Sequence, residues 1–175
     1  MPLTVVVAGR TAPNRAVRFG GETDPLDERG RRDIESLDIV VPRGVRVGPE
    51  TSVRETARIL GINVEPDPSL ATVDIARWLG VEPQDVPADE LEAWFTDPDA
   101  RPHGGETITE FVDRVVSATE GFDGLVVVAS PVAQALAAVS PGAYFEVSIR
   151  PGSAFTTTTV RPAELSDRDV AASRD

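Results

Sequence analysis

The chain of 175 residues has no cysteine, no lysine and a single histidine, His103. The absence of cysteine excludes a disulfide framework, a thiolate zinc site, an iron–sulfur cluster and a cysteine nucleophile. The absence of lysine excludes Schiff-base chemistry and the P-loop lysine. One histidine excludes mechanisms with two imidazoles and, without cysteine, leaves too few strong ligands for a tight transition-metal site. We therefore expect neither a cofactor nor a bound metal.

Positive charge is also scarce, since 29 acidic residues face 17 arginines and the net charge is −12 at pH 7. Nucleic acids and anionic lipid surfaces both require a basic face, so neither is an expected partner. No segment approaches the ~18 consecutive apolar residues of a membrane span. The amino terminus has no basic flank before its first apolar run, so no signal peptide is expected and the cytoplasm is the predicted location.

The length matches one domain, at ~100–200 residues per domain. We assign residues 1–161 to that domain and residues 162–175 to a polar, frayed tail. Short apolar runs predict strands at residues 3–7, 38–41, 62–64, 125–129, 145–149 and 155–160. Helices are predicted at residues 27–37, 52–60, 75–79, 88–95, 131–139 and from residue 107 onward. The alternation favours an α/β fold with a mostly parallel sheet.

Helix starts carry capping signals at three places. Asp27 is a predicted N-cap, and Ser52 with Glu55 and Thr107 with Glu110 have the spacing of capping boxes. Open parallel sheets bind ligands at the carboxyl ends of their strands. The segments that follow the predicted strands are therefore the places to look for a site.

Those segments contain motifs in a recognisable order. They are Val7-Ala8-Gly9-Arg10-Thr11-Ala12-Pro13-Asn14, Arg18-Phe19-Gly20-Gly21, Gly48 to Ala57, Leu70 to Gly80, and Gly104-Gly105-Glu106-Thr107. Their order and spacing over roughly residues 3–160 resemble the histidine phosphatase superfamily, the phosphoglycerate-mutase-like fold. The resemblance implies a three-layer α/β sandwich with a mostly parallel central sheet.

The chain departs from the family pattern at the positions that carry the chemistry. Where the family has its nucleophilic histidine, this chain has Ala8, and Val7 replaces the arginine before it. Ser52 stands in place of the second arginine, Thr72 in place of the acid that one branch uses, and Ser130 in place of the second histidine. The resemblance thus implies a degenerate member with no catalytic residue of the family kind.

The loss of these groups removes the chemical basis of phosphoryl transfer. Attack on phosphorus requires an imidazole nitrogen that Ala8 does not have. Hydrogen bonds to charged groups contribute ~1.5–3 kcal/mol each, so four lost positions forfeit roughly 6–12 kcal/mol if they add. A millimolar ligand binds with only about −4 kcal/mol. We therefore expect the ordinary phosphate site to be abolished.

Other polar residues remain candidates for binding a ligand, each with a plain structural alternative. Arg10, Asn14 and Arg18 together form a small anion site at the rim of the pocket, or Arg10 pairs with a carboxylate such as Glu22 or Asp24. Glu106 borders the pocket, or it caps a helix. His103 is a relocated base, or an exposed loop residue, which we favour.

Five further residues also have a structural alternative to a functional role. Ser130 is predicted to cap a helix rather than to act as a nucleophile, and Ser52 is explained equally well as a capping residue. Asp74 is predicted to cap a turn. Trp78 and Leu79 are predicted to pack in the core.

Three functions stay open at this point. The first, which we favour, is a non-enzymatic domain that binds an unknown small molecule or protein partner. The second is an enzyme of small-molecule metabolism that uses Arg10, Asn14, Arg18, Glu106 and His103 in a remodelled cleft. The third is a purely structural subunit with a filled pocket. A homodimer is compatible with all three, because related folds commonly form dimers.

Overall fold

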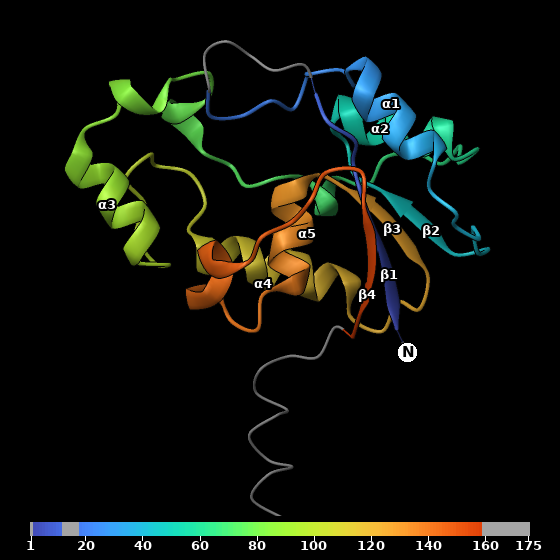
Figure 1. Ribbon diagram of the computed structural model, residues 1–175. Helices are drawn as coiled ribbons and strands as arrows, with labels where there is room; N and C mark the ends of the chain where they lie inside the picture. The colour runs from blue at the N-terminus through green and yellow to red at the C-terminus, as the bar shows by residue number, and fades with distance from the viewer. Residues whose placement is uncertain (1, 12–17, 159–175) are drawn as a thin grey trace, which may run out of the picture.

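The computed structural model describes residues 2–11 and 18–158, and these contain one four-stranded sheet (Figure 1). The strand order is β2-β3-β1-β4. Strands β1 (Leu3–Val7), β2 (Val45–Val47) and β3 (Leu125–Val128) run parallel, and β4 (Ala154–Thr157) runs antiparallel to β1. The predicted mostly parallel α/β sheet is confirmed.

Helices cover both faces of this sheet, so the structure has three layers (Figure 1). Val5 and Val7 of β1 belong to a core cluster with residues of α4 and α5, whereas Val6 and Ala8 belong to a second cluster with residues of α2. This division follows from the alternation of side chains along a strand. The helices are α1 (Glu28–Glu35), α2 (Thr51–Ile59), α3 (Ala88–Thr96), α4 (Ile108–Thr119) and α5 (Ser130–Ala137).

Two of the three predicted helix starts are confirmed. The Asp27 side chain accepts a hydrogen bond from the Gly30 N–H, and Thr107 with Glu110 forms the predicted capping box. The capping box at Ser52 is wrong, because α2 begins one residue earlier and Ser52 is buried within its first turn. Ser130 is not an N-cap either; it is the first residue of α5.

Three predicted strands are absent from the described structure. Residues 38–41 form no strand, and Val40 is 91% exposed; the strand that pairs with β3 lies four residues further on, at β2. Residues 62–64 lie in an irregular segment after the turn at Gly61. The stretch 145–149 begins inside a 3₁₀ turn, Pro141–Glu146, which buries Tyr144. Each run is short, and apolar content alone does not supply a neighbouring strand.

A group of aromatic side chains lies on the α3 side of the molecule. Trp78, in the predicted turn that forms the 3₁₀ segment Ala76–Trp78, is buried and stacks on Phe19 at a ring-centroid distance of 5.0 Å. Trp94 of α3 packs edge-on against Trp78 at 6.0 Å. The predicted core role of Trp78 is confirmed, whereas Leu79 is 58% exposed and its predicted core role is wrong.

None of the helices in residues 2–11 and 18–158 combines the length and apolar character that crossing a membrane requires. The predicted tail, residues 162–175, and Asn14 lie outside these described residues.

Candidate functional site

The carboxyl ends of the three parallel strands meet at one edge of the sheet. The Ala8 N–H, directly after β1, donates to the Val128 carbonyl at the end of β3 over 2.9 Å. The Gly48 N–H, directly after β2, donates to the Val127 carbonyl over 2.9 Å. A ligand site is expected at this edge in an open α/β sheet.

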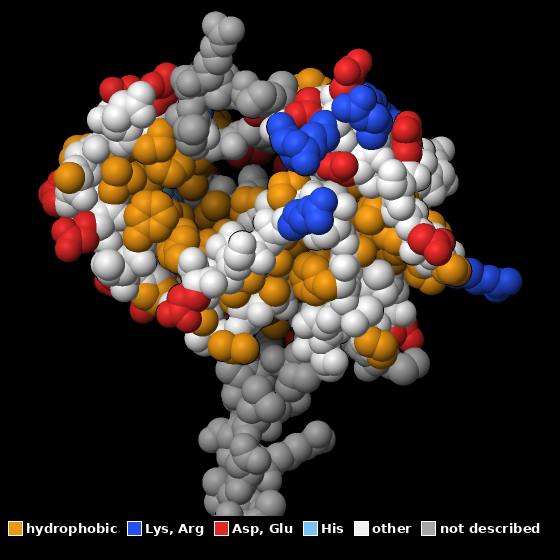
Figure 2. Space-filling model, in the orientation of Figure 1, with side chains coloured by type: hydrophobic (Ala, Val, Ile, Leu, Met, Phe, Trp, Pro, Cys, Tyr) orange, Lys and Arg blue, Asp and Glu red, His pale blue; other side chains and the backbone are white. Residues whose placement is uncertain are grey.

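A cavity of about 450 Å³ lies at this edge. Its wall combines the loop after β1, residues 19–24, the first turns of α2 and α5, residues 72–75, and the segment around Tyr144. Small-molecule sites typically enclose roughly 300–1,000 Å³. Figure 2 shows the molecule hollowed between the α3 side, where hydrophobic side chains gather, and the α1 side, where basic ones gather. The cavity is therefore large enough for a small ligand.

Four of the five positions that the motifs single out line this cavity. They are Ala8, Ser52, Thr72 and Ser130. The fifth, Val7, is fully buried in the core cluster that β1 forms with α4 and α5. The strand register also brings Ala129 next to Ala8, since Val7 is paired with Val128, and Ala129 lines the cavity as well. Neither Ala129 nor Ser130 supplies an imidazole.

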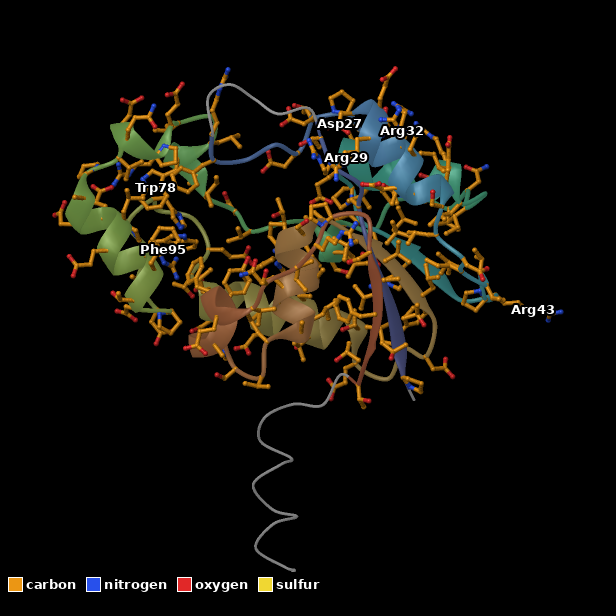
Figure 3. All side chains as sticks on the ribbon, in the orientation of Figure 1. Asp27, Arg29, Arg32, Arg43, Trp78 and Phe95 are labelled. Atoms are coloured by element: carbon orange, nitrogen blue, oxygen red, sulfur yellow. The ribbon has the colours of Figure 1, made fainter. Side chains whose placement is uncertain are left out.

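Arg10 lines the cavity but is held by a carboxylate. Its Nη2 lies 3.4 Å from Oδ2 of Asp27, and the Asp27 N–H donates to the Arg10 carbonyl over 2.9 Å. The predicted pairing with an acid therefore holds, although the partner is the N-cap residue of α1 rather than Glu22 or Asp24. Figure 3 shows Asp27 at this end of α1, with Arg29 and Arg32 further along the helix.

Two glycines let α1 approach the loop after β1 closely. A Cβ on Gly30 would overlap the backbone of Arg10, and a Cβ on Gly9 would lie 2.9 Å from the Gly30 carbonyl oxygen. The contact fixes where Arg10 enters the cavity wall.

Arg18 and Glu106 do not line the cavity. Arg18 is exposed. Glu106 is bound by Arg114 of α4, with Nε–Oε1 at 2.6 Å and Nη2–Oε2 at 2.9 Å, and it accepts the Asp74 N–H over 3.2 Å. Arg114 donates in addition to the carbonyls of Ser69, Ala71 and Thr72. Neither predicted role of Glu106, pocket border or helix cap, matches this placement: Glu106 and Arg114 hold the segment that carries Thr72 into the cavity wall.

His103 is not the exposed loop residue that we favoured, since only 1% of it is exposed. Its ring packs edge-on against Trp94 at 4.4 Å and Trp78 at 5.1 Å, and its Nδ1 accepts the Gly105 N–H over 2.9 Å. Burial lowers the pKa of His103, so the ring is held neutral. It contacts Trp94, which lines the cavity, but is not itself a lining residue.

Asp74 plays the predicted part of a turn cap, because its Oδ1 accepts the Ala76 N–H over 2.9 Å. This bond helps to set a strained turn, since Ala76 has a φ of +38°.

Glu50, for which the sequence predicted no role, is a buried acid in the cavity wall. It is only 4% exposed. Its Oε1 accepts the Thr72 N–H over 2.6 Å, but its Oε2 has no hydrogen-bond partner among the described residues. Burial raises the pKa of this carboxyl, and the hydrogen bonds from the backbone N–H groups of Thr72 and of Glu50 itself lower it. The nearby charge of Glu22 raises the pKa further, and that of Arg114 lowers it.

The described residues of the cavity wall carry more acidic than basic groups. Among the described lining residues, Glu22, Asp24 and Glu50 are acidic and Arg10 is basic. The remaining wall is largely apolar and includes the rings of Phe19, Trp94, Tyr144 and Phe145. Within the described residues, no group of three or more potential ligands is arranged to hold a metal ion.

A comparison with protein-family models identifies one family. The sequence model of the histidine phosphatase superfamily (branch 1) matches residues 3–143. No curated protein shows a significant sequence match.

Solved structures with the same fold include two from Thermus thermophilus. The protein TTHB049 is 26% identical, with a TM-score of 0.73 over 90% of this chain and 94% of that one. The structure described as phosphoglycerate mutase is 25% identical, with a TM-score of 0.71 over 90% and 92%. The structure described as mycobacterial hydrolase 2 is 22% identical, with a TM-score of 0.70 over 89% and 80%, and shows the fold alone.

Proposed function

The chain belongs to the histidine phosphatase superfamily, and we propose that it is a member that binds a small molecule without phosphohistidine chemistry. The observation that carries this proposal is Ala8. It follows β1 in the cavity wall, at the position where the family motif has its nucleophile, and its methyl group cannot attack phosphorus. The described lining residues include no histidine that takes over this role.

The charge of the cavity supports the same proposal. Phosphoryl transfer depends on cations around the transferred group. Here Arg10 is paired with Asp27, while Glu22, Asp24 and Glu50 place negative charge in the wall. Three of the four charged residues in the described wall would therefore repel a phosphate group.

The two other functions have less support. The hypothesis of an enzyme with a remodelled cleft requires five residues in that cleft: Arg10, Asn14, Arg18, His103 and Glu106. Of the four that are described, only Arg10 reaches the cavity. A purely structural subunit would have a filled pocket, whereas about 450 Å³ is open here. The cytoplasm remains the proposed location.

The test is hydrolysis of p-nitrophenyl phosphate by the purified protein. We expect no turnover above the buffer rate, and no rise in melting temperature with millimolar inorganic phosphate. Ser52→Asp provides a check on traces of contaminating phosphatase, because it adds a negative charge to the cavity near the start of α2, where helices favour acids. Turnover that follows the protein through every column and is lost in Ser52→Asp would contradict the proposal.

A further inference from the structure

Two phenylalanine rings in the cavity wall remain partly exposed. Phe19 is half-buried and Phe145 is 36% exposed, and both line the cavity. They come from distant parts of the chain, because Phe19 precedes α1 and Phe145 lies in the 3₁₀ turn Pro141–Glu146. Apolar surface that the fold leaves open in a concave site favours the binding of an apolar ligand. The proposed function as it stands gives neither ring a role.

Buried aromatic neighbours hold both rings in place. Phe19 stacks on Trp78 at a centroid distance of 5.0 Å. Phe145 packs edge-on against Tyr144 at 4.9 Å and against Trp94 at 5.9 Å. Trp94 and Tyr144 are each only 4% exposed, and both also line the cavity. A side chain whose position is already fixed loses little freedom when a ligand packs against it, which favours binding.

This wall suits an aromatic ligand better than an aliphatic one. Aromatic rings have a negative face and a positive edge, so they attract one another in stacked and edge-on arrangements. Both arrangements already occur around the cavity, stacked at Phe19 and edge-on at Phe145. A ligand ring adds another pair of the same kind, whereas a saturated ring offers apolar contact alone.

We propose that the cavity binds a small molecule with an aromatic ring, and that this ring packs against Phe19 and Phe145. The inference rests on the proposed function, because it takes the cleft to be a binding site without phosphate chemistry. The contact uses ring surface in the cavity wall, and it requires no charged group of that wall.

Two alcohols that differ only in their ring separate aromatic binding from merely apolar binding. They are 2-phenylethanol and 2-cyclohexylethanol, each titrated by calorimetry into the full chain at neutral pH. The hydroxyl-bearing residues Ser52, Thr72 and Ser130 line the cavity and are equally able to bond to either alcohol. We expect 2-phenylethanol to bind at least about threefold more tightly, because aromatic pairs are stabilised beyond the area that they bury. A cavity that selects only for apolar surface would instead favour the saturated ring, which has more of it.

Two leucine variants assign the preference to the cavity wall. Phe145→Leu keeps an apolar side chain but removes a ring from the wall, and we expect it to lose at least about threefold in affinity for 2-phenylethanol. Phe95→Leu is the matched control. Phe95 of α3, labelled in Figure 3, packs edge-on against Phe145 at 4.9 Å and is 52% exposed, but it does not line the cavity. We expect this control to change the affinity by less than about twofold. Circular dichroism checks that both variants are folded.

Several outcomes would overturn the inference. They are equal or tighter binding of 2-cyclohexylethanol, an unchanged affinity in Phe145→Leu, an equal loss in Phe95→Leu, and no binding of 2-phenylethanol up to about 10 mM. The two alcohols on the unaltered protein decide the ring preference even where Phe145→Leu fails to fold. Hydrolysis of p-nitrophenyl phosphate would instead overturn the proposed function, so the two failures are distinguishable.

Discussion

Two carboxylates hold the same short segment of chain in opposite ways. Glu50 accepts the N–H of Thr72, and Glu106 accepts the N–H of Asp74. Both oxygens of Glu106 are also bound by the guanidinium of Arg114, which donates to three carbonyls of the segment. Glu50 has one oxygen with no partner in the described structure. Both oxygens of Glu106 are therefore used by the fold, whereas one oxygen of Glu50 is buried without a hydrogen bond from the described residues.

We expect the largest change in stability when the hydrogen bonds that Arg114 donates to Glu106 and to the neighbouring carbonyls are removed. Arg114→Met keeps much of the side-chain volume against Phe111 but leaves Glu106 and the carbonyls of the segment without their donor. We expect a loss of about 2–3 kcal/mol in the free energy of unfolding, measured with urea. Arg29→Met, on the exposed face of α1, serves as the matched control and should change it by less than about 0.5 kcal/mol. Similar free energies of unfolding for the two variants would show that the hydrogen bonds of Arg114 do not stabilise the protein.

The next largest change in stability is expected at the close contact between Gly105 and the carbonyl of Asp74. A Cβ on Gly105 would overlap the carbonyl of Asp74, to which the Glu106 N–H is bonded over 2.8 Å. Gly105→Ala should therefore destabilise the protein by about 1–3 kcal/mol, the usual range for overpacking. Gly142→Ala is the control, because nothing lies within 4 Å of its Cβ position. If Gly105→Ala melts at the temperature of the control, the close contact does not matter.

The smallest effect, of opposite sign, concerns Glu50. Burial holds its folded pKa above the ordinary value of 4.5, so the folded protein binds this proton more tightly than the unfolded chain. The penalty for ionising the group is absent at pH values below about 4.5, grows as pH rises through the folded pKa, and is then constant.

Glu50→Gln removes that penalty. We expect the variant to exceed the wild type in melting temperature near pH 8 and to approach it near pH 4.5, with Glu22 and Arg114 as the charged groups that act on the site. Taking the difference between the two proteins cancels other titrations. A constant difference across this range would mean that Glu50 is not the titrating group.

The parts of the fold that local sequence determines were predictable. The buried run 125–128, the N-cap at Asp27 and the capping box at Thr107 depend on neighbours in the chain, and all three are present. The strands predicted at 38–41 and 145–149 failed, because a strand exists only where another strand pairs with it. The edge strand β2 has just three residues, too few for a period to be visible.

The location of the cavity was predictable from the sequence, but the roles of some residues in and near it were not. The rule that ligands lie beyond strand ends located the cavity, and the motif positions Ala8, Ser52, Thr72 and Ser130 do line it. The importance of Glu50 could not be derived, since burial and a missing donor arise only when distant segments pack together. The burial of His103 could not be predicted for the same reason, because it results from packing against Trp78 and Trp94.

The place of His103 has a practical consequence. It is the one imidazole in the chain, and it is held edge-on between two indoles, one of which lines the cavity. Ring currents from both indoles act on its carbon-bound protons. Proton magnetic resonance therefore has a built-in, label-free reporter one side chain away from whatever enters the cleft.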